Sequence, residues 1–411
     1  MRILFLSRWY PFPPNNGSKI RVYNLLTGLS REHEVSLISF YESTDPEPKL
    51  THMQKICRDV LVIQHKSFAP NSFHAVLGFF SLKPRSYMNM FSNEMRDRIE
   101  KSIQENSYDC IIASQVDMAA YAGWFNSVPA VFEEAELGII YDQFTAADSI
   151  LAKLRHWLTW SKHRSFMAAL LKNFDLTTVV SERERQLLSR IAPQYSPLEI
   201  IPNGVNLKSY AGIRAAPKAE TLVFTGSFNY PPNYHGMVWF LEKVYPLLKS
   251  EHPNLQVTVT GAHGGRPLPH PDHVNLTGYI DDIRPVIAGA WCSIAPLHSG
   301  GGTRLKILEA MALHTPVVST TKGAEGLDVI HGENILLADD PQHFAEAVGR
   351  ILKSSQLRQK LAENAYNLVC DKYDWDIIMG RFLGLLERTV NPQTAPISAQ
   401  LETGGLFGVK K

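Results

Sequence analysis

Short apolar runs alternate with longer, helix-periodic segments along most of the chain, and this alternation restricts the fold more than any other feature. Helical patterns such as SKIRVYNLLTGLSRE at 18–32 follow most of the apolar runs. The runs in the first half that we predict to be strands are 3–7, 35–40, 60–63, 110–114, 130–132 and 176–181. Strands that alternate with helices form a parallel sheet covered on both faces.

The same alternation restarts after a pause, which predicts a second α/β domain. Pro202, Asn203 and Gly204 mark a turn, and a small, polar stretch follows it. The predicted strands of the second half are 221–226, 255–261, 274–278, 292–297 and 315–320. We therefore expect domains at 1–205 and 220–374 with a linker at 206–219, and a polar, Gly-rich, disordered tail at 391–411.

Charge and cysteine content exclude several classes of protein. The formal net charge is +1, so the chain lacks the basic excess typical of nucleic-acid binding. The four cysteines are far apart and form no CxxC pair, which argues against a disulfide framework or a zinc site and favours a cytoplasmic protein. No apolar stretch approaches the roughly 18 residues of a membrane span, and the N-terminal run is too short for a signal peptide.

The segment HSGGGTRLKILEAMALHTPVV at 298–318 carries the clearest functional signal. Glycines let a backbone approach a ligand closely, and the helix that starts near Thr303 offers unpaired N–H groups to an anion. Arg304 and Lys306 add positive charge, and Glu309 can accept hydrogen bonds from sugar hydroxyls. The pattern indicates a site for a diphosphate and a ribose. The alternative is a Gly-rich turn before a core helix, with Lys306 and Glu309 paired three residues apart.

This segment resembles the nucleotide-sugar-binding signature of family-4 glycosyltransferases, which have the GT-B fold. The supporting matches follow in order along residues 2–390: PPNNGSKIR, SERERQLL, IIPNGVN, LVFTG, LTGYIDDIRPVIAGAWCSIAPL and DKYDWDIIMGRF. The resemblance implies two Rossmann-like domains that face each other across a cleft, with a C-terminal helix at 375–390 that packs back on the first domain. It also implies sugar transfer from a nucleotide-diphosphate donor with retention at the anomeric carbon, without a metal or another cofactor.

The motif and its resemblance give a set of candidate site residues. We expect Arg304 and Lys306 to stabilise the leaving diphosphate, and Glu309 corresponds to the family's ribose ligand. The other candidates for donor binding are Gly17, Lys19, Gly226, Gly301, Gly302, Thr303, Leu305 and Glu325. For Glu325, which follows the strand at 315–320, a helix cap is the alternative.

The chain departs from the family pattern at three places. The first of two glutamates in the signature falls on Gly301, so backbone N–H groups of 301–303 would have to replace it. The loop GSFNYPPNYHG at 226–236 lacks the arginine and lysine that the family often carries there. A sugar-contacting histidine of the first domain is replaced by Ser114, Gln115 and Asp117.

Charged residues of the first half leave two interpretations open. Lys19 and Arg21 lie at the start of a helix and would reach the diphosphate, or they are ordinary solvated positions. Glu133, Glu134 and Glu136 follow a strand and would line the acceptor side, or they form a solvated acidic loop.

The segment 153–172 combines five Lys or Arg with two tryptophans and no acidic residue. A basic amphipathic helix of this kind is typical of an anionic membrane surface, and lipid-linked acceptors are common in the family. The alternative is a helix that packs its apolar face inward.

Other acidic and histidine motifs are weaker signals. His270, Asp272 and His273 have loose metal-ligand spacing in a proline-rich loop, and we predict no metal site there. Asp281–Asp282 and Asp339–Asp340 are interpreted as helix caps.

The sequence thus predicts a glycosyltransferase that acts on a glycan, a lipid-linked molecule or another glycoconjugate, as in polysaccharide biosynthesis. Two alternatives stay open: a nucleotide-sugar epimerase on the same fold, and a catalytically silent subunit that binds a nucleotide sugar. We expect a cytoplasmic protein with possible peripheral contact at the inner face of the membrane, and no nucleic-acid partner.

Overall fold

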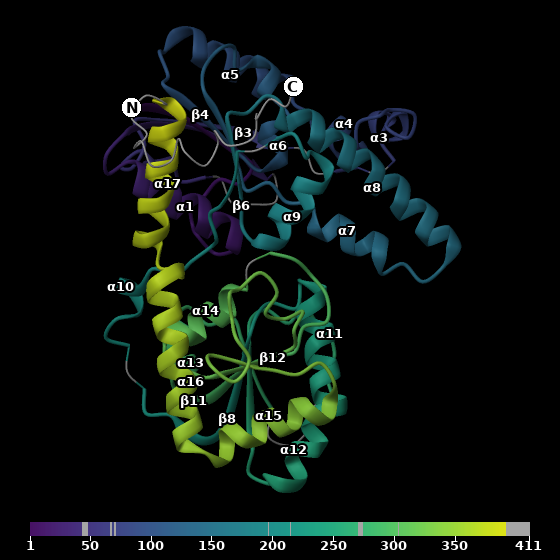
Figure 1. Cartoon of the computed structure of the whole chain (residues 1–411), viewed down its shortest axis with the longest axis vertical. Coiled ribbons are helices and arrows are strands. Elements are labelled where there is room, and N and C mark those ends of the chain that lie inside the picture. The colour runs from purple at the N-terminus through teal and green to yellow at the C-terminus, as the bar shows by residue number, and fades with distance from the viewer. Residues whose placement is uncertain are drawn as a thin grey trace, which may run out of the picture. The chain divides into compact units, whose positions relative to one another are not determined.

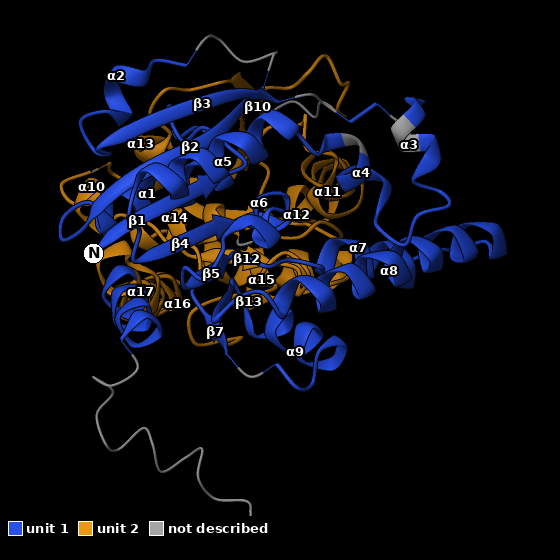
Figure 2. Ribbon diagram, turned by 90° about the horizontal axis from the view of Figure 1, so that it is seen from above, with its two compact units in different colours: residues 1–201, 379–411 blue, residues 202–378 orange. Residues whose placement is uncertain are grey.

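The computed structural model contains two parallel sheets, each within its own compact unit (Figures 1 and 2). Unit 1 comprises residues 1–201 and 379–411, and unit 2 comprises residues 202–378. The structure describes residues 1–42, 48–65, 68–69, 71–195, 197–213, 215–269, 274–302 and 304–391. Residues 392–411 of the tail predicted at 391–411, Thr303 and the HPDH motif at 270–273 lie outside the described residues.

The sheet of unit 1 has the order β3-β2-β1-β4-β5-β6-β7, and its strand pairs are parallel. Its strands are β1 (Arg2–Ser7), β2 (Glu34–Glu42), β3 (Asp59–His65), β4 (Cys110–Ser114), β5 (Ala130–Glu133), β6 (Leu176–Val179) and β7 (Leu198–Ile200). The order reverses between β1 and β4, where the chain turns from one side of the sheet to the other. Such a reversal opens a ligand-binding position beyond the carboxyl ends of the strands.

Helices cover both faces of this sheet and bury a core that includes Leu4, Ile111, Phe132 and Leu188. They are α1 (Gly17–Leu29), α2 (Leu50–Met53), α3 (Phe73–Leu77), α4 (Arg85–Met90), α5 (Asn93–Glu105), α6 (Gln115–Ala119), the 3-10 helix η1 (Ala122–Trp124), α7 (Gly138–Thr145), α8 (Ile150–Leu171) and α9 (Glu182–Ile191). The side chain of Asn16 caps α1 and Ser149 caps α8, as polar N-cap residues commonly do.

Unit 2 repeats this plan with the order β10-β9-β8-β11-β12-β13. Its strands are β8 (Lys218–Thr225), β9 (Gln256–Thr260), β10 (Val274–Gly278), β11 (Ala290–Ala295), β12 (Val317–Ser319) and β13 (Leu336–Leu337). Its helices are α10 (Leu207–Tyr210), α11 (Pro231–Trp239), the π-helix η2 (Phe240–Val244), α12 (Tyr245–Glu251), α13 (Arg284–Ala288), α14 (Leu305–Ala312), α15 (Pro341–Lys353), α16 (Ser355–Leu368) and the π-helix η3 (Val369–Tyr373). The order reverses between β8 and β11.

The sequence predicted the doubly wound fold correctly, and every predicted strand is present. It missed β7 and β13, which have three and two residues and are edge strands of their sheets. The segment 206–219, for which we expected a linker, belongs to unit 2 in the structure. Leu207, Tyr210 and Ile213 pack against the core cluster around α14, so apolar contacts hold this segment in place.

The last helix, α17 (Trp375–Val390), has the predicted bounds and returns the chain to unit 1. Met379, Phe382 and Leu386 are buried. A Cβ atom on Gly28 of α1 would lie 2.6 Å from the side chain of Met379, so this glycine allows the two helices to approach closely. Packing of α17 on unit 1 therefore completes the core of that unit.

Helix α8 extends beyond the sheet of unit 1 in both views (Figures 1 and 2). From its middle onward it buries Trp160, Met167 and Leu171, whereas Ile150 and Leu151 near its start are exposed. The inward-packing interpretation of 153–172 therefore holds for part of this helix, and the contact with a membrane surface stays a prediction. Among the described residues, no helix is long and apolar enough to cross a membrane.

Candidate functional site

Glycines in unit 2 bring the ends of neighbouring strands close together. Gly226 follows β8 with a φ of 149°, and Gly261 follows β9 with a φ of 111°. A Cβ atom on Gly261 would lie 2.6 Å from the backbone of Gly226, and one on Gly226 would lie 2.9 Å from Nζ of Lys306. Only glycine fits at both positions, which leaves backbone exposed at the carboxyl edge of the sheet.

The glycine loop follows β11, on the other side of the strand reversal. Gly300 and Gly302 have φ values of 94° and 78°, and a Cβ atom on Gly300 would collide with Oη of Tyr230. Gly302 is exposed and has open space beside it. Gly301 lies between them, so this part of the loop offers backbone rather than side chains.

Helix α14 begins where this loop ends. Leu305 is its first residue, and no side chain caps its N-terminus. The first N–H groups of an α-helix have no intrahelical partner and attract anions. The glycine loop thus leads directly into an uncapped helix start, and the anion site expected from the sequence stays a prediction.

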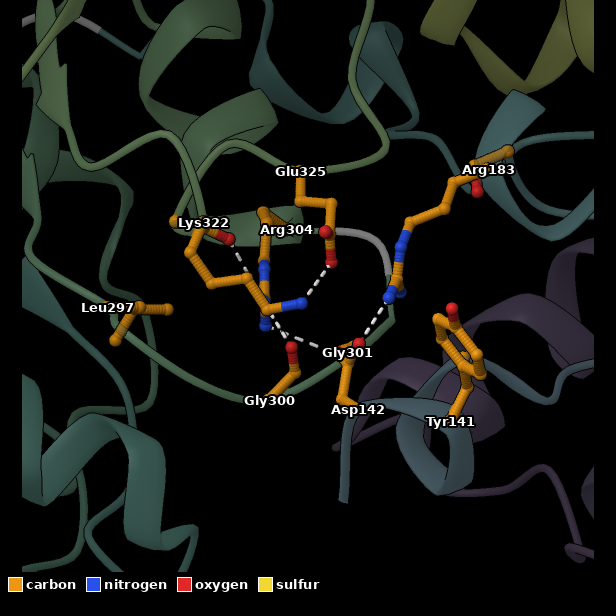
Figure 3. A network of polar contacts seen from close by, with 12 residues as sticks. Tyr141, Asp142, Arg183, Leu297, Gly300, Gly301, Arg304, Lys322 and Glu325 are labelled. Atoms are coloured by element: carbon orange, nitrogen blue, oxygen red, sulfur yellow. Dashed lines mark hydrogen bonds and ion pairs between the residues drawn. The ribbon is translucent and has the colours of Figure 1, made fainter. Parts of the chain in front are cut away.

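Arg304 differs from its predicted role in this structure. Its Nη1 donates a hydrogen bond to the carbonyl oxygen of Gly301 at 2.9 Å, and its Nη2 donates to that of Gly300 at 2.7 Å (Figure 3). A third contact joins Nη2 to the carbonyl oxygen of Lys322 at 3.3 Å. The planar guanidinium group, which we expected to hold phosphate oxygens, braces the glycine loop because three carbonyl groups converge on it.

Lys306 lies in the centre of the site. Its Nζ donates a hydrogen bond to Oδ1 of Asn233 at 2.8 Å and lies 4.0 Å from the centre of the Phe224 ring. Asn233 is part of the loop and helix that follow β8, which carry no arginine or lysine. Lys306 therefore brings an ammonium group to the loop that lacks the family's usual cations.

Burial changes the electrostatics of this lysine. It lowers the pKa of Lys306 from 10.5 to about 7, and the positive charge of Arg304 lowers it as well. A buried ammonium group without a full counter-charge is costly, and a bound diphosphate would supply that charge.

Glu309 lies one turn further along α14. Its Oε1 accepts a hydrogen bond from Oη of Tyr210 at 3.2 Å. Burial raises the pKa of Glu309 to about 7, while the hydrogen bond and the charge of Lys306 oppose this rise. Among the described residues no ion pair joins Lys306 to Glu309, so the pairing in the predicted alternative is not found, although α14 is a core helix as that alternative expected.

Glu325 faces the same region from the segment after β12. Its Oε2 lies 2.5 Å from Nζ of Lys322, and both side chains are about three-quarters buried. The carbonyl oxygen of Lys322 accepts a hydrogen bond from Arg304, so this ion pair lies beside the guanidinium group. A pairing role, rather than a helix cap, accounts for Glu325 in the structure.

The acidic and basic candidates of unit 1 form a buried network instead of a solvated surface. Arg21 is fully buried, and its Nε donates to Oε1 of Glu133 at 2.6 Å. Ser114 donates to the other oxygen of Glu133 at 2.6 Å, and Nη2 of Arg21 donates to the carbonyl oxygen of Ile201 at 2.9 Å. Glu133 is fully buried and therefore cannot contact an acceptor, and Arg21 is held in the core. Both earlier interpretations of these two residues are wrong.

Two other residues of unit 1 that contact each other have unusual backbone dihedral angles. Gln115 and Glu134 follow β4 and β5 with φ values of 69° and 57°, and Nε2 of Gln115 donates to Oε2 of Glu134 at 2.8 Å. Non-glycine residues with positive φ cluster at ligand sites. Glu134 is nearly buried, so it does not belong to a solvated loop. This pair marks the carboxyl edge of the unit 1 sheet as its candidate ligand edge.

Helix α1 starts at the same edge. Gly17 is its first residue, and the backbone N–H of Lys19 donates to Oδ1 of Asn16 at 3.0 Å. Lys19 is buried rather than solvated. Ser18 contributes its hydroxyl group, which lies 3.4 Å from Nε2 of Gln115.

Sequence reasoning missed several partners that shape these sites. Asn233, Tyr210 and Lys322 were not candidates, although each contacts a predicted site residue. Asn233 was detectable as a polar residue in the segment 226–236, which follows a predicted strand. Tyr210 was not, because its contact with Glu309 joins segments that are far apart in the chain.

The described residues contain no group of three or more metal-binding side chains. Asp282 accepts a hydrogen bond from the N–H of Arg284 at 3.1 Å, and Asp340 caps α15. The interpretation as a helix cap is therefore confirmed for Asp340, whereas no side chain caps α13, whose N-cap residue is Ile283. Asp339 instead accepts hydrogen bonds from Thr321 at 2.7 and 2.8 Å.

Family comparisons match both halves of the chain. Residues 15–209 match the family described as "Glycosyltransferase Family 4", and residues 219–354 match "Glycosyl transferases group 1". Among curated proteins, an uncharacterised 44.6 kDa protein of the cps region of Klebsiella pneumoniae is 24% identical over 394 residues, which cover 91% of this chain and 96% of that protein.

Solved structures share the fold over nearly the full length. A sucrose-phosphate synthase from Thermosynechococcus elongatus has a TM-score of 0.67 and 19% identity, and the match covers 96% of this chain and all of that one. HepE of Anabaena in complex with UDP-glucose has a TM-score of 0.65 and 14% identity, with 94% and 99% coverage.

Proposed function

This chain belongs to the family-4 glycosyltransferases of the GT-B fold, and we propose that it transfers a sugar from a nucleotide-diphosphate donor with retention of the anomeric configuration. The acceptor in this proposal is a glycan or a lipid-linked glycoconjugate. The observation that carries it is the partly buried ammonium group of Lys306 beside the uncapped start of α14. The bound UDP-glucose of HepE agrees with a nucleotide-sugar donor.

In this proposal, different residues of unit 2 contact different parts of the donor. Backbone at Gly226, Gly301 and Gly302 lies close to the diphosphate, and Glu309 accepts hydrogen bonds from the ribose. Negative charge grows on the diphosphate as the sugar–phosphate bond breaks, so fixed positive groups lower the barrier. Lys306 and the N–H groups of α14 supply them, and no metal is needed in this proposal. Arg304 keeps the glycine loop in shape.

We assign the binding of the acceptor to unit 1. The Gln115–Glu134 pair offers an amide and a carboxylate at the edge of the sheet, where sugar hydroxyls would find both donors and acceptors. The leaving phosphate accepts the proton of the attacking hydroxyl group, so no separate protein base is assigned. This division places Glu134, but not Glu133, near the acceptor.

We also assign a peripheral contact with the inner face of the membrane to the segment 153–172. Its exposed apolar residues and its five Lys or Arg residues suit an anionic bilayer. Sedimentation with vesicles that contain phosphatidylglycerol tests this contact, and the bound fraction should fall as salt is added. Equal binding to purely zwitterionic vesicles would argue against it.

Release of nucleoside diphosphate from a panel of UDP-, GDP- and ADP-sugars, with and without acceptor extracts, tests the proposed reaction. Gly226→Ala should abolish release and weaken nucleoside diphosphate binding at least tenfold, because its Cβ atom enters the site. Gly212→Ala is the matched control, since Gly212 also has a positive φ but open space beside it.

The outcomes separate the proposal from its alternatives. Binding of a nucleotide sugar without any turnover would favour the catalytically silent subunit. Conversion of one nucleotide sugar into its epimer, with the diphosphate intact, would favour the epimerase. Equal behaviour of the two glycine variants would remove the donor site from this edge of unit 2.

A further inference from the structure

We propose that a large apolar cavity in unit 1 binds the hydrocarbon chain of the acceptor, which makes the acceptor a lipid. The inference rests on the proposed function and narrows its acceptor to one chemical class. It depends on the lining of the cavity, the exposed side chains at its mouth and the charge around it, none of which belongs to the donor site.

The cavity has a volume of about 730 Å³ and is lined mainly by apolar and aromatic side chains. Its walls come from α4, η1 and α8, and include Tyr87, Trp124, Phe166 and Leu170. Cavities that hold small ligands typically enclose roughly 300–1,000 Å³. A space of this size, with few polar groups, suits a flexible hydrocarbon chain better than a sugar.

Contacts between the walls keep the cavity open. The ring of Tyr87 stacks on that of Phe166 with centroids 4.9 Å apart, which joins α4 to α8. Nζ of Lys162 on α8 donates to the carbonyl oxygens of Gly78 and Phe79 at 2.9 and 2.8 Å. These bonds fix the segment between α3 and α4 against α8, so the cavity is formed before a ligand arrives.

The mouth of the cavity exposes apolar side chains to solvent. Leu82 lines the cavity and is 89% exposed, and the neighbouring Phe80 is also 89% exposed. Phe73 and Phe79 on the same segment are exposed as well. Large apolar groups that cluster at the entrance of an apolar cavity favour contact with lipid over contact with water.

The charge around the mouth selects an anionic lipid over a neutral one. Lys83 lines the cavity, and Arg85 follows it with its guanidinium group 3.7 Å from the centre of the Phe79 ring. The segment 68–91, which contributes Lys83 and Arg85, contains no aspartate or glutamate, and Lys162 and Arg164 precede the lining residue Ser165 on α8. A phosphate joined to the hydrocarbon chain would be stabilised at this mouth. The proposed acceptor is therefore a lipid-linked glycoconjugate whose hydrocarbon chain enters the cavity, whose linking phosphate lies at the mouth and whose sugar carries the attacking hydroxyl group.

Calorimetric titration with farnesyl monophosphate, kept below its critical micelle concentration, tests the proposal. The wild type should bind it saturably. Gly123 lines the cavity, and a Cβ atom there would meet nothing within 4 Å, so Gly123→Leu should fill the cavity without a clash. This variant should weaken binding at least tenfold. Gly380→Leu is the control, because Gly380 also lies in unit 1 with open space beside it.

A second pair of measurements assigns the charge. Lys83→Gln should weaken binding of farnesyl monophosphate several-fold and leave binding of farnesol unchanged. Absence of saturable binding by the wild type, or equal affinity of Gly123→Leu and Gly380→Leu, would overturn the proposal. Nucleoside diphosphate affinity of each variant is measured in parallel. If the wild type binds nucleoside diphosphate but no lipid, this inference alone is refuted. If the wild type does not bind nucleoside diphosphate, the proposed function is refuted.

Discussion

Replacement of Lys306 by methionine should stabilise the folded protein while it impairs the reaction. Methionine retains most of the apolar stem against the Phe224 ring and removes the ammonium group. The pKa of Lys306 falls from 10.5 to about 7 because the side chain is buried. Since each pKa unit corresponds to about 1.36 kcal/mol, the charged lysine costs the fold up to about 5 kcal/mol, and about 4 kcal/mol at pH 7.

The dependence of this effect on pH follows from the sign of the shift. Below pH 7 the lysine is protonated in the folded and the unfolded chain, so the whole penalty is present. Between pH 7 and 10.5 the unfolded chain binds more protons, and the wild type therefore becomes more stable as the pH rises. The advantage of Lys306→Met should shrink to about 2 kcal/mol at pH 9 and vanish above the unfolded pKa.

Urea unfolding of both proteins at pH 7 and pH 9, without nucleotide, measures this difference. Steady-state kinetics on the same preparations should show a kcat about 100- to 1,000-fold lower for the variant, the range for loss of one fixed donor to a developing negative charge. Equal stabilities at pH 7, or a difference that does not change with pH, would refute the burial argument. A normal kcat would refute the assignment of Lys306 to the leaving diphosphate.

Three further predictions concern the same unit. Glu309→Gln should weaken both the donor and the free nucleoside diphosphate about ten- to a hundredfold by calorimetry, because a charge-assisted hydrogen bond is worth roughly 1.5–3 kcal/mol; unchanged affinities would make Glu309 structural. Arg304→Lys should raise the donor KM more than it lowers kcat, since an ammonium group cannot hold the carbonyl oxygens of Gly300 and Gly301 together, and a selective loss of kcat would instead place Arg304 on the diphosphate. Turnover should survive EDTA, and its complete loss with recovery on adding magnesium or manganese would contradict the metal-free mechanism.

The sequence predicted features that depend on local pattern. Alternation of strands and helices determines a parallel sheet, and the carboxyl edge then follows from topology alone. Gly226 and the glycine loop could be placed at that edge because a glycine directly after a strand indicates a positive φ or a close approach of the backbone to a ligand. The unpaired N–H groups at the start of α14 were also predictable, because the first N–H groups of any α-helix have no intrahelical partner.

Contacts between distant segments could not be predicted in this way. Arg21 and Glu133 are 112 positions apart in the sequence. A cation near the start of a helix is expected to be solvent-exposed, and only the folded structure shows that Glu133, at the end of β5, lies beside it. The direction of the Arg304 guanidinium group depends on where three carbonyl groups converge. The contact of Tyr210 with Glu309 arises because the segment expected to be a linker packs against the core of unit 2.

The return of α17 to unit 1 has a consequence for biosynthesis. All residues of unit 2 leave the ribosome before Met379, Phe382 and Leu386, which complete the core of unit 1. At roughly 5–20 residues per second, translation from 202 to 378 takes on the order of 10–35 s. During this interval the surface around Gly28 lacks its cover, so nascent unit 1 would be the part of the chain that needs a chaperone, and messages truncated before codon 379 would yield a product whose second unit folds while its first does not.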